Sequence, residues 1–160
     1  MRALLILLLA LVNLFPAVAY SADIKITDGD TIKIEDVKIR LWGIDAPELK
    51  QYCTKDDKPY ACGKAAKLAL ESFVNARNEM GAKGEVQCNV LDIDRYKRKV
   101  ARCTLDGADL GSMMVRFGYA LEYERYSEGF YTDAQKEAIA AKRGLWSMEF
   151  QNPWDWRRQH

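Results

Sequence analysis

The sequence predicts one α+β domain, built from short strands and amphipathic helices. Its 160 residues provide room for one domain but not comfortably for two. Hydrophobic residues make up 49% of the chain and charged residues 29%, as in an ordinary globular protein, which excludes a disordered or collagen-like chain. No internal repeat or low-complexity linker divides the sequence. The order of the patterns fits a β part of five strands combined with three helices.

Three short segments rich in β-branched and aromatic residues predict a meander at the start of the domain. They are residues 24–27, 31–34 and 37–42. An Asp-Gly pair and a Glu-Asp pair separate them and predict turns. The next segment, residues 51–60, is polar, rich in lysine and contains a proline, so we expect a surface loop there.

Apolar residues then recur at a spacing of three to four, which predicts helices. An amphipathic helix is expected from residue 63 to about residue 78, and a short helix over residues 110–117. Thr132 and Gln135 form a capping-box pattern that predicts the start of a third helix, and residues 142–144 (Lys-Arg-Gly) are typical of its end.

Residues 85–91 and 99–105 predict an antiparallel hairpin around residues 94–97. If Asp94 and Lys97 flank a two-residue turn, each residue of one strand faces a fixed partner on the other. Cys88 then lies opposite Cys103, Val90 opposite Ala101 and Asp92 opposite Lys99. Directly opposed Cα atoms lie about 4.5–5.5 Å apart, within the range of a disulfide.

The register therefore predicts a Cys88–Cys103 disulfide, which leaves Cys53 to pair with Cys62 at the base of the lysine-rich loop. One alternative is a zinc site, but the sequence has no Cys-x-x-Cys motif and no histidine placed to complete one. The other alternative is four reduced, buried thiols, which an oxidising compartment disfavours.

The first 19 residues have the pattern of a secretory signal peptide. Arg2 supplies a positive charge, an apolar run interrupted by Asn13 follows, and residues 17–19 (Ala-Val-Ala) form a small-residue cleavage site. A second possible cleavage position follows Ala22. The alternative is an uncleaved membrane anchor, since the apolar run is near the minimum length that spans a bilayer. We expect export to the periplasm or the extracellular medium, without stable membrane association once the signal is cleaved.

The single histidine, His160, is the last residue of the sequence, where we do not expect the fold to hold an imidazole in place. Ser-His-Asp hydrolases, His-dependent nucleases and His-ligated zinc enzymes are therefore disfavoured. Removal of residues 1–19 leaves equal numbers of basic and acidic residues, so anion binding must arise from local arrangement.

Two acidic segments and two arginines stand out as candidates for a functional site. Asp28-Gly29-Asp30-Thr31 is by itself typical of a turn, and Asp45-Ala46-Pro47-Glu48 of a loop or helix entry. Arg40 lies in the strand before the second segment, and Arg98 follows the turn of the predicted hairpin. Each segment alone is ambiguous.

Taken in order and spacing, these segments resemble the staphylococcal nuclease (thermonuclease) family. The likeness rests on Asp28-Gly29-Asp30-Thr31, on residues 40–48 (Arg-Leu-Trp-Gly-Ile-Asp-Ala-Pro-Glu) and on residues 94–98 (Asp-Arg-Tyr-Lys-Arg). It implies an OB-fold β-barrel of five strands with three α-helices over residues 23–147, with residues 148–160 as a C-terminal tail. It also implies Ca²⁺-dependent endonucleolytic cleavage of DNA and RNA to 3′-phosphate ends.

The resemblance assigns a role to each candidate residue. It implies Ca²⁺ ligands at Asp30, Asp45 and the Ala46 carbonyl, which are the hard oxygen donors that this ion prefers. It makes Glu48 the base that activates water. Arg40 and Arg98 would hold the phosphate through bidentate contacts. Tyr96 and Tyr126 would contact the substrate.

Two other functions remain open from the sequence. One is a non-catalytic nucleic-acid-binding OB-fold domain, which would use basic grooves and aromatic platforms. The other is a secreted, disulfide-stapled protein with a partner other than nucleic acid. The resemblance implies a monomer, since family members of this size are usually monomeric.

Overall fold

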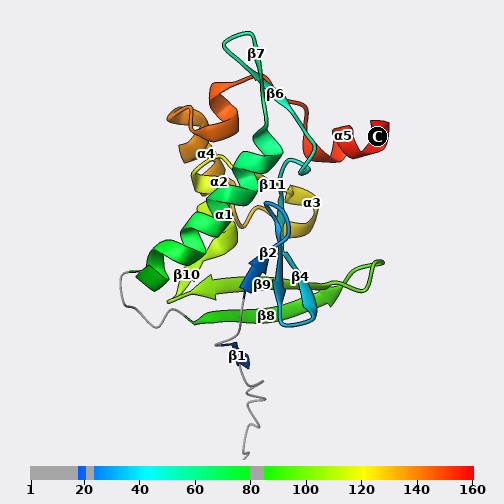
Figure 1. Ribbon diagram of the computed structural model, residues 1–160, viewed down its shortest axis with the longest axis vertical. Coiled ribbons are helices and arrows are strands. Elements are labelled where there is room, and N and C mark those ends of the chain that lie inside the picture. Colours follow the sequence, from blue (N-terminus) through cyan, green and yellow to red (C-terminus); the bar gives the residue numbers. More distant parts are fainter. Residues whose placement is uncertain (1–17, 21–23, 80–84) are drawn as a thin grey trace, which may run out of the picture.

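The computed structural model describes residues 18–20, 24–79 and 85–160 and shows a mixed α+β domain (Figure 1). Seven strands form the main sheet: β1 (Val18–Tyr20), β2 (Ile24–Ile26), β3 (Thr31–Ile34), β4 (Val37–Leu41), β8 (Val86–Ile93), β9 (Lys99–Leu105) and β10 (Ala108–Asp109). Their order is β1-β8-β9-β4-β3-β2, and β10 pairs with β9. Neighbours are antiparallel except for β4 and β9, which are parallel.

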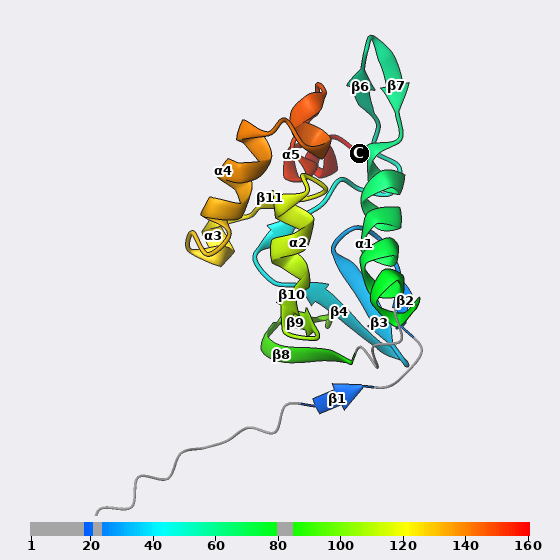
Figure 2. The same cartoon turned by 90° about the vertical axis from the view of Figure 1, so that its left-hand side faces the viewer.

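Two small sheets and the helices complete the domain. The sheets pair β5 (Ile44–Asp45) with β11 (Leu121–Glu122) and β6 (Cys53–Lys55) with β7 (Lys58–Tyr60). The helices are α1 (Cys62–Glu79), α2 (Leu110–Arg116), α3 (Glu124–Ser127), α4 (Thr132–Ala140), the 3₁₀ helix η1 (Gly144–Ser147) and α5 (Pro153–Gln159). Helices α1, α2 and α4 lie side by side on one side of β8 and β9 (Figure 2).

The predicted fold class is confirmed, but the finer description is only partly so. The five expected strands are present in one sheet as β2, β3, β4, β8 and β9. Among the described strands, however, the path ends at β1 and at β2, so hydrogen bonding does not close the sheet into a barrel. The same residues form five α-helices instead of three. The prediction of a closed barrel with three helices was therefore too specific.

The β8–β9 hairpin has the predicted register at its base and a different one at its tip. Cys88 faces Cys103 and Val90 faces Ala101, but a bulge at Leu91 shifts the pairing beyond it. Asp92 consequently faces Val100, so the predicted pair with Lys99 was wrong. The reason lies in the turn, which has three central residues.

At that turn, the Asp94 backbone bonds to both Arg98 and Lys97. The Lys97 N–H donates to the Asp94 carbonyl at 2.9 Å. The Asp94 N–H donates to the Arg98 carbonyl at 3.0 Å, and Lys97 closes the turn with φ at 64°. The extra turn residue shifts the pairing of the two strands by one position. The bulge at Leu91 shifts it back, so the pairs at the base of the hairpin match the predicted register.

Both disulfides join the predicted partners. Cys53 bonds to Cys62 with the Cα atoms 5.7 Å apart, and Cys88 bonds to Cys103 with the Cα atoms 4.1 Å apart. The second distance is shorter than the expected 4.5–5.5 Å.

Residues 51–60 do not form the expected loop. They form the β6–β7 hairpin, whose turn residues Asp56 and Asp57 have φ angles of 50° and 57°. Aspartate tolerates this left-handed conformation, which a two-residue hairpin turn requires. The lysines that flank the turn hid the strand pattern in the sequence.

The predicted capping box of α4 is also absent. Thr132 is the first helical residue, and its hydroxyl donates to a Glu122 carboxylate oxygen at 2.8 Å. The Gln135 side chain accepts the Glu122 backbone N–H at 2.8 Å. Both side chains therefore attach α4 to β11 and do not cap the helix.

Two groups of buried residues form the core. The larger group lies between the main sheet and helices α1, α2 and α4, and includes Ile32, Ile39, Leu70 and Met114. The smaller consists of Cys53, Cys62, Leu121 and Leu145, with Trp146, Met148, Phe150 and Trp154 packed against it.

The smaller core fixes residues 148–160, which the sequence marked as a tail. Glu149 pairs with Thr54 of β6, and the Gln51 side chain donates to the Gln151 carbonyl at 2.7 Å. Helix α5 is thereby held near the segment that leads into β6 (Figure 1). Within the described residues, no helix has the length and apolar character needed to cross a membrane. Residues 1–17 of the expected signal peptide lie outside the described residues, and β1 spans its first cleavage position.

Candidate active site

A close approach of two loops builds the centre of the site. Gly29 packs so tightly that a Cβ there would lie 2.7 Å from the Cβ atoms of both Ala46 and Ala66. Only glycine permits this contact. It brings the adjacent Asp30, which is 4% exposed, to Ala46, whose backbone N–H donates to Asp30 Oδ2 at 3.2 Å.

Arg40 joins the two buried aspartates. It lies on β4 opposite Thr31, and its Nη1 donates to Asp30 Oδ1 at 3.0 Å. Its Nη2 donates to Asp45 Oδ1 at 2.7 Å and to the Ile44 carbonyl at 3.3 Å. Burial alone would lower the pKa of Arg40, but the charges of Asp30 and Asp45 outweigh it and raise the pKa. Arg40 is therefore a fixed cation in the site.

Glu48 is held through its backbone. Its N–H donates to the Gln51 side-chain carbonyl at 3.1 Å, and its own carbonyl accepts the Gln51 N–H at 2.7 Å. The same carbonyl lies against the first turn of α1, where a Cβ at Gly63 would come within 1.8 Å of it. Gln51 is fully buried. The sequence did not predict its role, because a glutamine in a polar segment is normally expected on the surface.

Arg157 of α5 enters the site from the far end of the chain. It donates to Asp45 Oδ1 at 2.9 Å and Oδ2 at 2.8 Å, and to Glu48 Oε1 at 2.7 Å. Burial alone would lower the pKa of Arg157, but the hydrogen bonds to Asp45 and Glu48 outweigh this effect and raise the pKa above its usual value. Sequence reasoning missed Arg157 too. The only available signal was the Asn152-Pro153 helix start followed by paired tryptophans and arginines.

Arg98 connects to the same network at longer range. Its Nη1 lies 3.5 Å from the Thr31 hydroxyl, which in turn donates to Asp30 at 2.9 Å. Its Nε donates to Asp94 Oδ2 at 2.7 Å, and its guanidinium lies 5.6 Å from the centre of the Tyr96 ring. Burial would raise the pKa of Asp94, but hydrogen bonds from Arg98 lower it overall.

The two tyrosines differ in their relation to this network. Tyr96 contacts Arg98, as just described. Tyr126 lies on α3, is 54% exposed, and packs edge-on against Tyr123 with the ring centres 4.9 Å apart. Tyr123 is itself stacked on Trp154 of α5 at 5.3 Å. The described contacts of Tyr126 do not include Asp30, Asp45 or Glu48.

Asp28 lies next to the cluster and accepts the Asp30 N–H at 3.1 Å. Burial, followed by the charge of Asp30, raises its pKa to about 6. The negative charges of Asp28 and Asp30 repel each other, and a cation bound near both carboxylates would offset this repulsion.

The donor set fits a hard divalent cation in its chemistry. Asp30, before β3, and Asp45, at the end of β5, are buried carboxylates, and the Ala46 N–H donates to Asp30. The described residues contain no group of three or more histidine, cysteine or acidic side chains arranged around a metal position. A cation here would consequently rely on two carboxylates, a backbone carbonyl and water, a combination that Ca²⁺ accepts.

Fold and site together define a mixed α+β protein whose carboxylates and arginines can hold a hard cation and a phosphate group side by side. The sequence model described as "Staphylococcal nuclease homologue" matches residues 38–148. The chain belongs to this family, as its three motifs predicted.

Individual relatives carry several names. An "Uncharacterized endonuclease" of Escherichia coli O157:H7 is 34% identical over 143 residues, which cover 85% of this chain and 83% of that protein. The "Succinoglycan biosynthesis protein ExoI" of Rhizobium meliloti (strain 1021) is 32% identical over 126 residues, covering 78% of this chain and 63% of that protein. The "Probable staphylococcal-like nuclease CAN2" of Oryza sativa subsp. japonica is 32% identical over 131 residues, which cover 81% of this chain. The chain spans less than two thirds of the second protein and only 31% of the third.

Proposed function

We propose that this protein is a Ca²⁺-dependent endonuclease that hydrolyses phosphodiester bonds of DNA and RNA and leaves 3′-phosphate ends. The observation that carries the proposal is the continuous network from Arg98 through Thr31, Asp30, Arg40, Asp45 and Arg157 to Glu48. The network combines carboxylates, arginines and a candidate base, and nucleic-acid binding alone does not require such a set. The endonuclease and nuclease names of several relatives support the same reading.

The arginines bind the scissile phosphate. Asp30, Asp45 and the Ile44 carbonyl fix the Arg40 guanidinium, which limits the rotamer entropy that it loses when it meets an anion. Arg98 is restrained in the same way by Asp94. Planar guanidinium groups match the geometry of phosphate oxygens, and their charge stabilises the pentacoordinate transition state.

Glu48 accepts the proton of the attacking water. Its side chain is 33% exposed, so water can reach it, while Gln51 and α1 hold its backbone in place. The water oxygen bonds to phosphorus as the bond from phosphorus to the 5′ oxygen breaks. The 5′ oxygen takes up a proton from solvent water as it leaves, and the phosphate stays on the 3′ side.

Asp30, Asp45 and the Ala46 carbonyl would hold Ca²⁺. When bound, the ion supplies positive charge that polarises the phosphate and offsets the charge of the transition state. The protein's own part is to bring the two carboxylates together, through the close packing at Gly29 and the hydrogen bonds of Arg40 to both.

We further propose that the protein is exported, after cleavage of residues 1–19, to the periplasm or the extracellular medium and acts there as a monomer. Two disulfides support an oxidising compartment. N-terminal sequencing and gel filtration of the exported protein test these points.

The test of the activity uses purified protein with single-stranded DNA, double-stranded DNA and RNA, in Ca²⁺ or in EDTA. We expect cleavage in Ca²⁺ only, with fragments whose 3′ ends become extendable after phosphatase treatment. A shifted but intact band would instead indicate the non-catalytic binding domain. Neither cleavage nor a shift would indicate a partner other than nucleic acid.

A further inference from the structure

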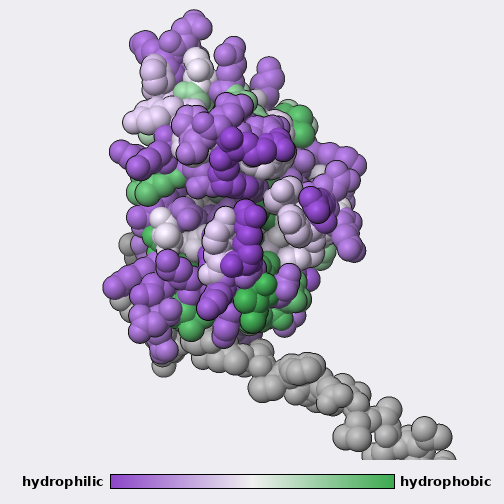
Figure 3. Space-filling model, turned by 90° about the vertical axis from the view of Figure 1, so that its right-hand side faces the viewer, coloured by the Kyte–Doolittle hydropathy of each residue, from purple (hydrophilic) through white to green (hydrophobic). Residues whose placement is uncertain are grey.

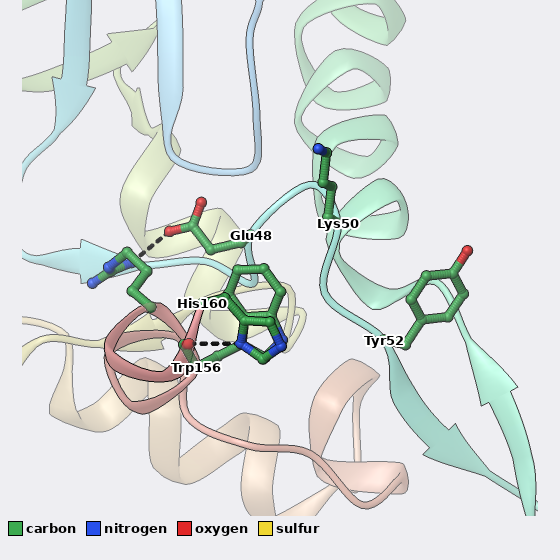
Figure 4. Close-up of a pocket in the computed structure, with 6 residues that line it drawn as sticks. Glu48, Lys50, Tyr52, Trp156 and His160 are labelled. Carbon is green, nitrogen blue, oxygen red and sulfur yellow. Dashed lines mark hydrogen bonds and ion pairs between the residues drawn. The ribbon is translucent and has the colours of Figure 1, made fainter.

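A hollow of about 560 Å³ opens beside Glu48, between the segment that leads into β6 and helix α5 (Figure 4). Its lining residues are Glu48, Lys50, Tyr52, Trp156, Arg157 and His160. This volume is in the range of small-molecule sites and is large enough for one nucleotide. Because Glu48 forms part of the wall, an occupant lies directly beside the site described above.

Aromatic rings border the hollow from two elements. The Trp156 ring is stacked on the His160 ring with the centres 4.2 Å apart and the planes within 9°. Tyr52 lies across from this pair in Figure 4 and is 58% exposed. Trp154, by contrast, is stacked on Tyr123 and packs on the smaller core. Of the two tryptophans of α5, Trp154 therefore packs on the smaller core and Trp156 lines the hollow.

The charges of the lining favour an anionic occupant. Lys50 supplies a positive charge to the lining, whereas the charge of Arg157 is paired with the carboxylates of Glu48 and Asp45. The same side of the molecule, seen in Figure 3, is mainly hydrophilic with separate apolar patches. Exposed aromatic rings beside cations are the combination with which proteins hold unpaired nucleotides, by stacking on the base and pairing with the phosphate.

We propose that this hollow is a subsite for one unpaired nucleotide next to the scissile phosphate, with its base on the Trp156–His160 platform and its phosphate near Lys50. The proposal rests on the proposed function for the identity of the neighbouring phosphate. It adds a pocket for the base, which can enter the hollow only when it is not paired. Single-stranded DNA and RNA, or locally opened duplexes, are therefore the substrates that the hollow accepts.

The test measures binding of a fluorescein-labelled single-stranded oligonucleotide by anisotropy in EDTA, so that cleavage does not interfere. We expect Trp156→Ala to weaken binding by roughly five- to hundred-fold, the usual effect of losing one stacked base. Trp156→Phe keeps a ring and should restore most of the affinity. Tyr52→Ser, on a different element, should weaken binding even if Trp156→Ala loosens α5.

Tyr60→Ser is the matched control, because Tyr60 is another exposed tyrosine of the β6–β7 hairpin and does not line the hollow. It should bind as wild type does. Wild-type affinity in both Trp156→Ala and Tyr52→Ser, or no oligonucleotide binding by the wild type in EDTA, would overturn the subsite. A DNA oligonucleotide and its RNA equivalent should both show the effect, since the rings read the face of the base and not the sugar.

Activity in Ca²⁺ separates this proposal from the proposed function. If the wild type does not cleave but the ring variants lose affinity, the nuclease assignment is wrong and the subsite remains. If the wild type cleaves, the ring variants should raise KM for single strands more than they lower kcat. Cleavage with an unchanged KM in both variants would contradict the subsite alone.

Discussion

Arg157 and Asp45 are 112 residues apart in the sequence, yet both carboxylate oxygens of Asp45 accept hydrogen bonds from the Arg157 guanidinium. Asp45 is fully buried, and its Oδ1 also accepts from Arg40. The buried carboxylate of Asp45 thus accepts hydrogen bonds from two arginines. An added cation at Asp45 must share the carboxylate with them.

The first prediction concerns this contact. Arg157→Gln should bind Ca²⁺ more tightly than the wild type, because a positive charge next to Asp45 and Glu48 is removed. In EDTA the same variant should lose about 1–3 kcal/mol of unfolding free energy, below the usual value for a fully buried pair because Arg157 is 35% exposed. Calorimetric titration and urea unfolding measure the two effects.

Arg158→Gln is the control for this prediction. Arg158 is the next residue of α5, is 75% exposed and pairs with Asp155 instead of with the site. It should change neither Ca²⁺ affinity nor stability by more than a few tenths of a kcal/mol. Equal Ca²⁺ affinities for the two variants would show that Arg157 does not compete with the cation.

The second prediction concerns the proposed base. Glu48→Gln should lower kcat by about 10²- to 10⁴-fold, the usual contribution of a general base, and leave Ca²⁺ binding largely intact. Arg98→Lys should also lower kcat strongly, because an ammonium group cannot replace the planar fork at the phosphate. Single-turnover cleavage at saturating Ca²⁺ measures both, and near-normal rates would contradict the assigned roles.

These positions show what the sequence could predict. Asp30, Arg40, Asp45 and Glu48 lie within 19 residues of one another, so short motifs sufficed to identify them as candidate site residues. Arg157 could not be found in this way, because its position depends on how the smaller core holds α5.

The pairing within the two hairpins could also be predicted only in part from the sequence. The two-residue turn assumed between Asp94 and Lys97 is wrong, yet it led to the right pairing of Cys88 with Cys103, because the bulge at Leu91 offsets the extra turn residue. The tip depends on whether Lys97 adopts a positive φ, which no pattern of polarity reveals. The turn at Asp56 and Asp57 was missed for the same reason.

The third prediction concerns pH. Burial raises the folded-state pKa of Asp28 to about 6, whereas the unfolded value is 3.8. The native state therefore binds this proton more tightly, and ionisation of Asp28 lowers the free energy of unfolding as the pH rises from about 4 to 6. Above that range the full cost of up to about 3 kcal/mol remains.

Asp28→Asn should accordingly stabilise the protein at pH 7 in EDTA and change its stability little at pH 3.5. The asparagine can still accept the Asp30 N–H through its side-chain oxygen. Urea unfolding at a series of pH values measures the difference. A variant that is less stable than wild type at pH 7 would show that the Asp28 charge is compensated in the fold.

The fourth prediction concerns the close packing of Gly63. A Cβ at this position would lie 1.8 Å from the Glu48 carbonyl oxygen, which is backbone and cannot rotate away. Gly63→Ala should therefore push the Glu48 segment from α1, lower the melting temperature and reduce kcat. Gly107→Ala is the contrast, because nothing lies within 4 Å of a Cβ there; with φ at 80° it should cost some stability but leave the kcat unchanged.

The last prediction concerns the Cys53–Cys62 disulfide, which closes a short loop at the base of the β6–β7 hairpin. Replacing both cysteines with serine should lower the unfolding free energy by roughly 2–3 kcal/mol, the chain-entropy value for a loop of about ten residues. Both cysteines also belong to the smaller core that holds Trp154 and hence α5. The loss should therefore reach Arg157 and weaken its hold on Asp45. Urea unfolding should show the lower stability, and the double variant should bind Ca²⁺ more tightly, as Arg157→Gln does. The Cys88–Cys103 double variant, whose bond lies across the β8–β9 hairpin, should lose stability without that change in Ca²⁺ affinity.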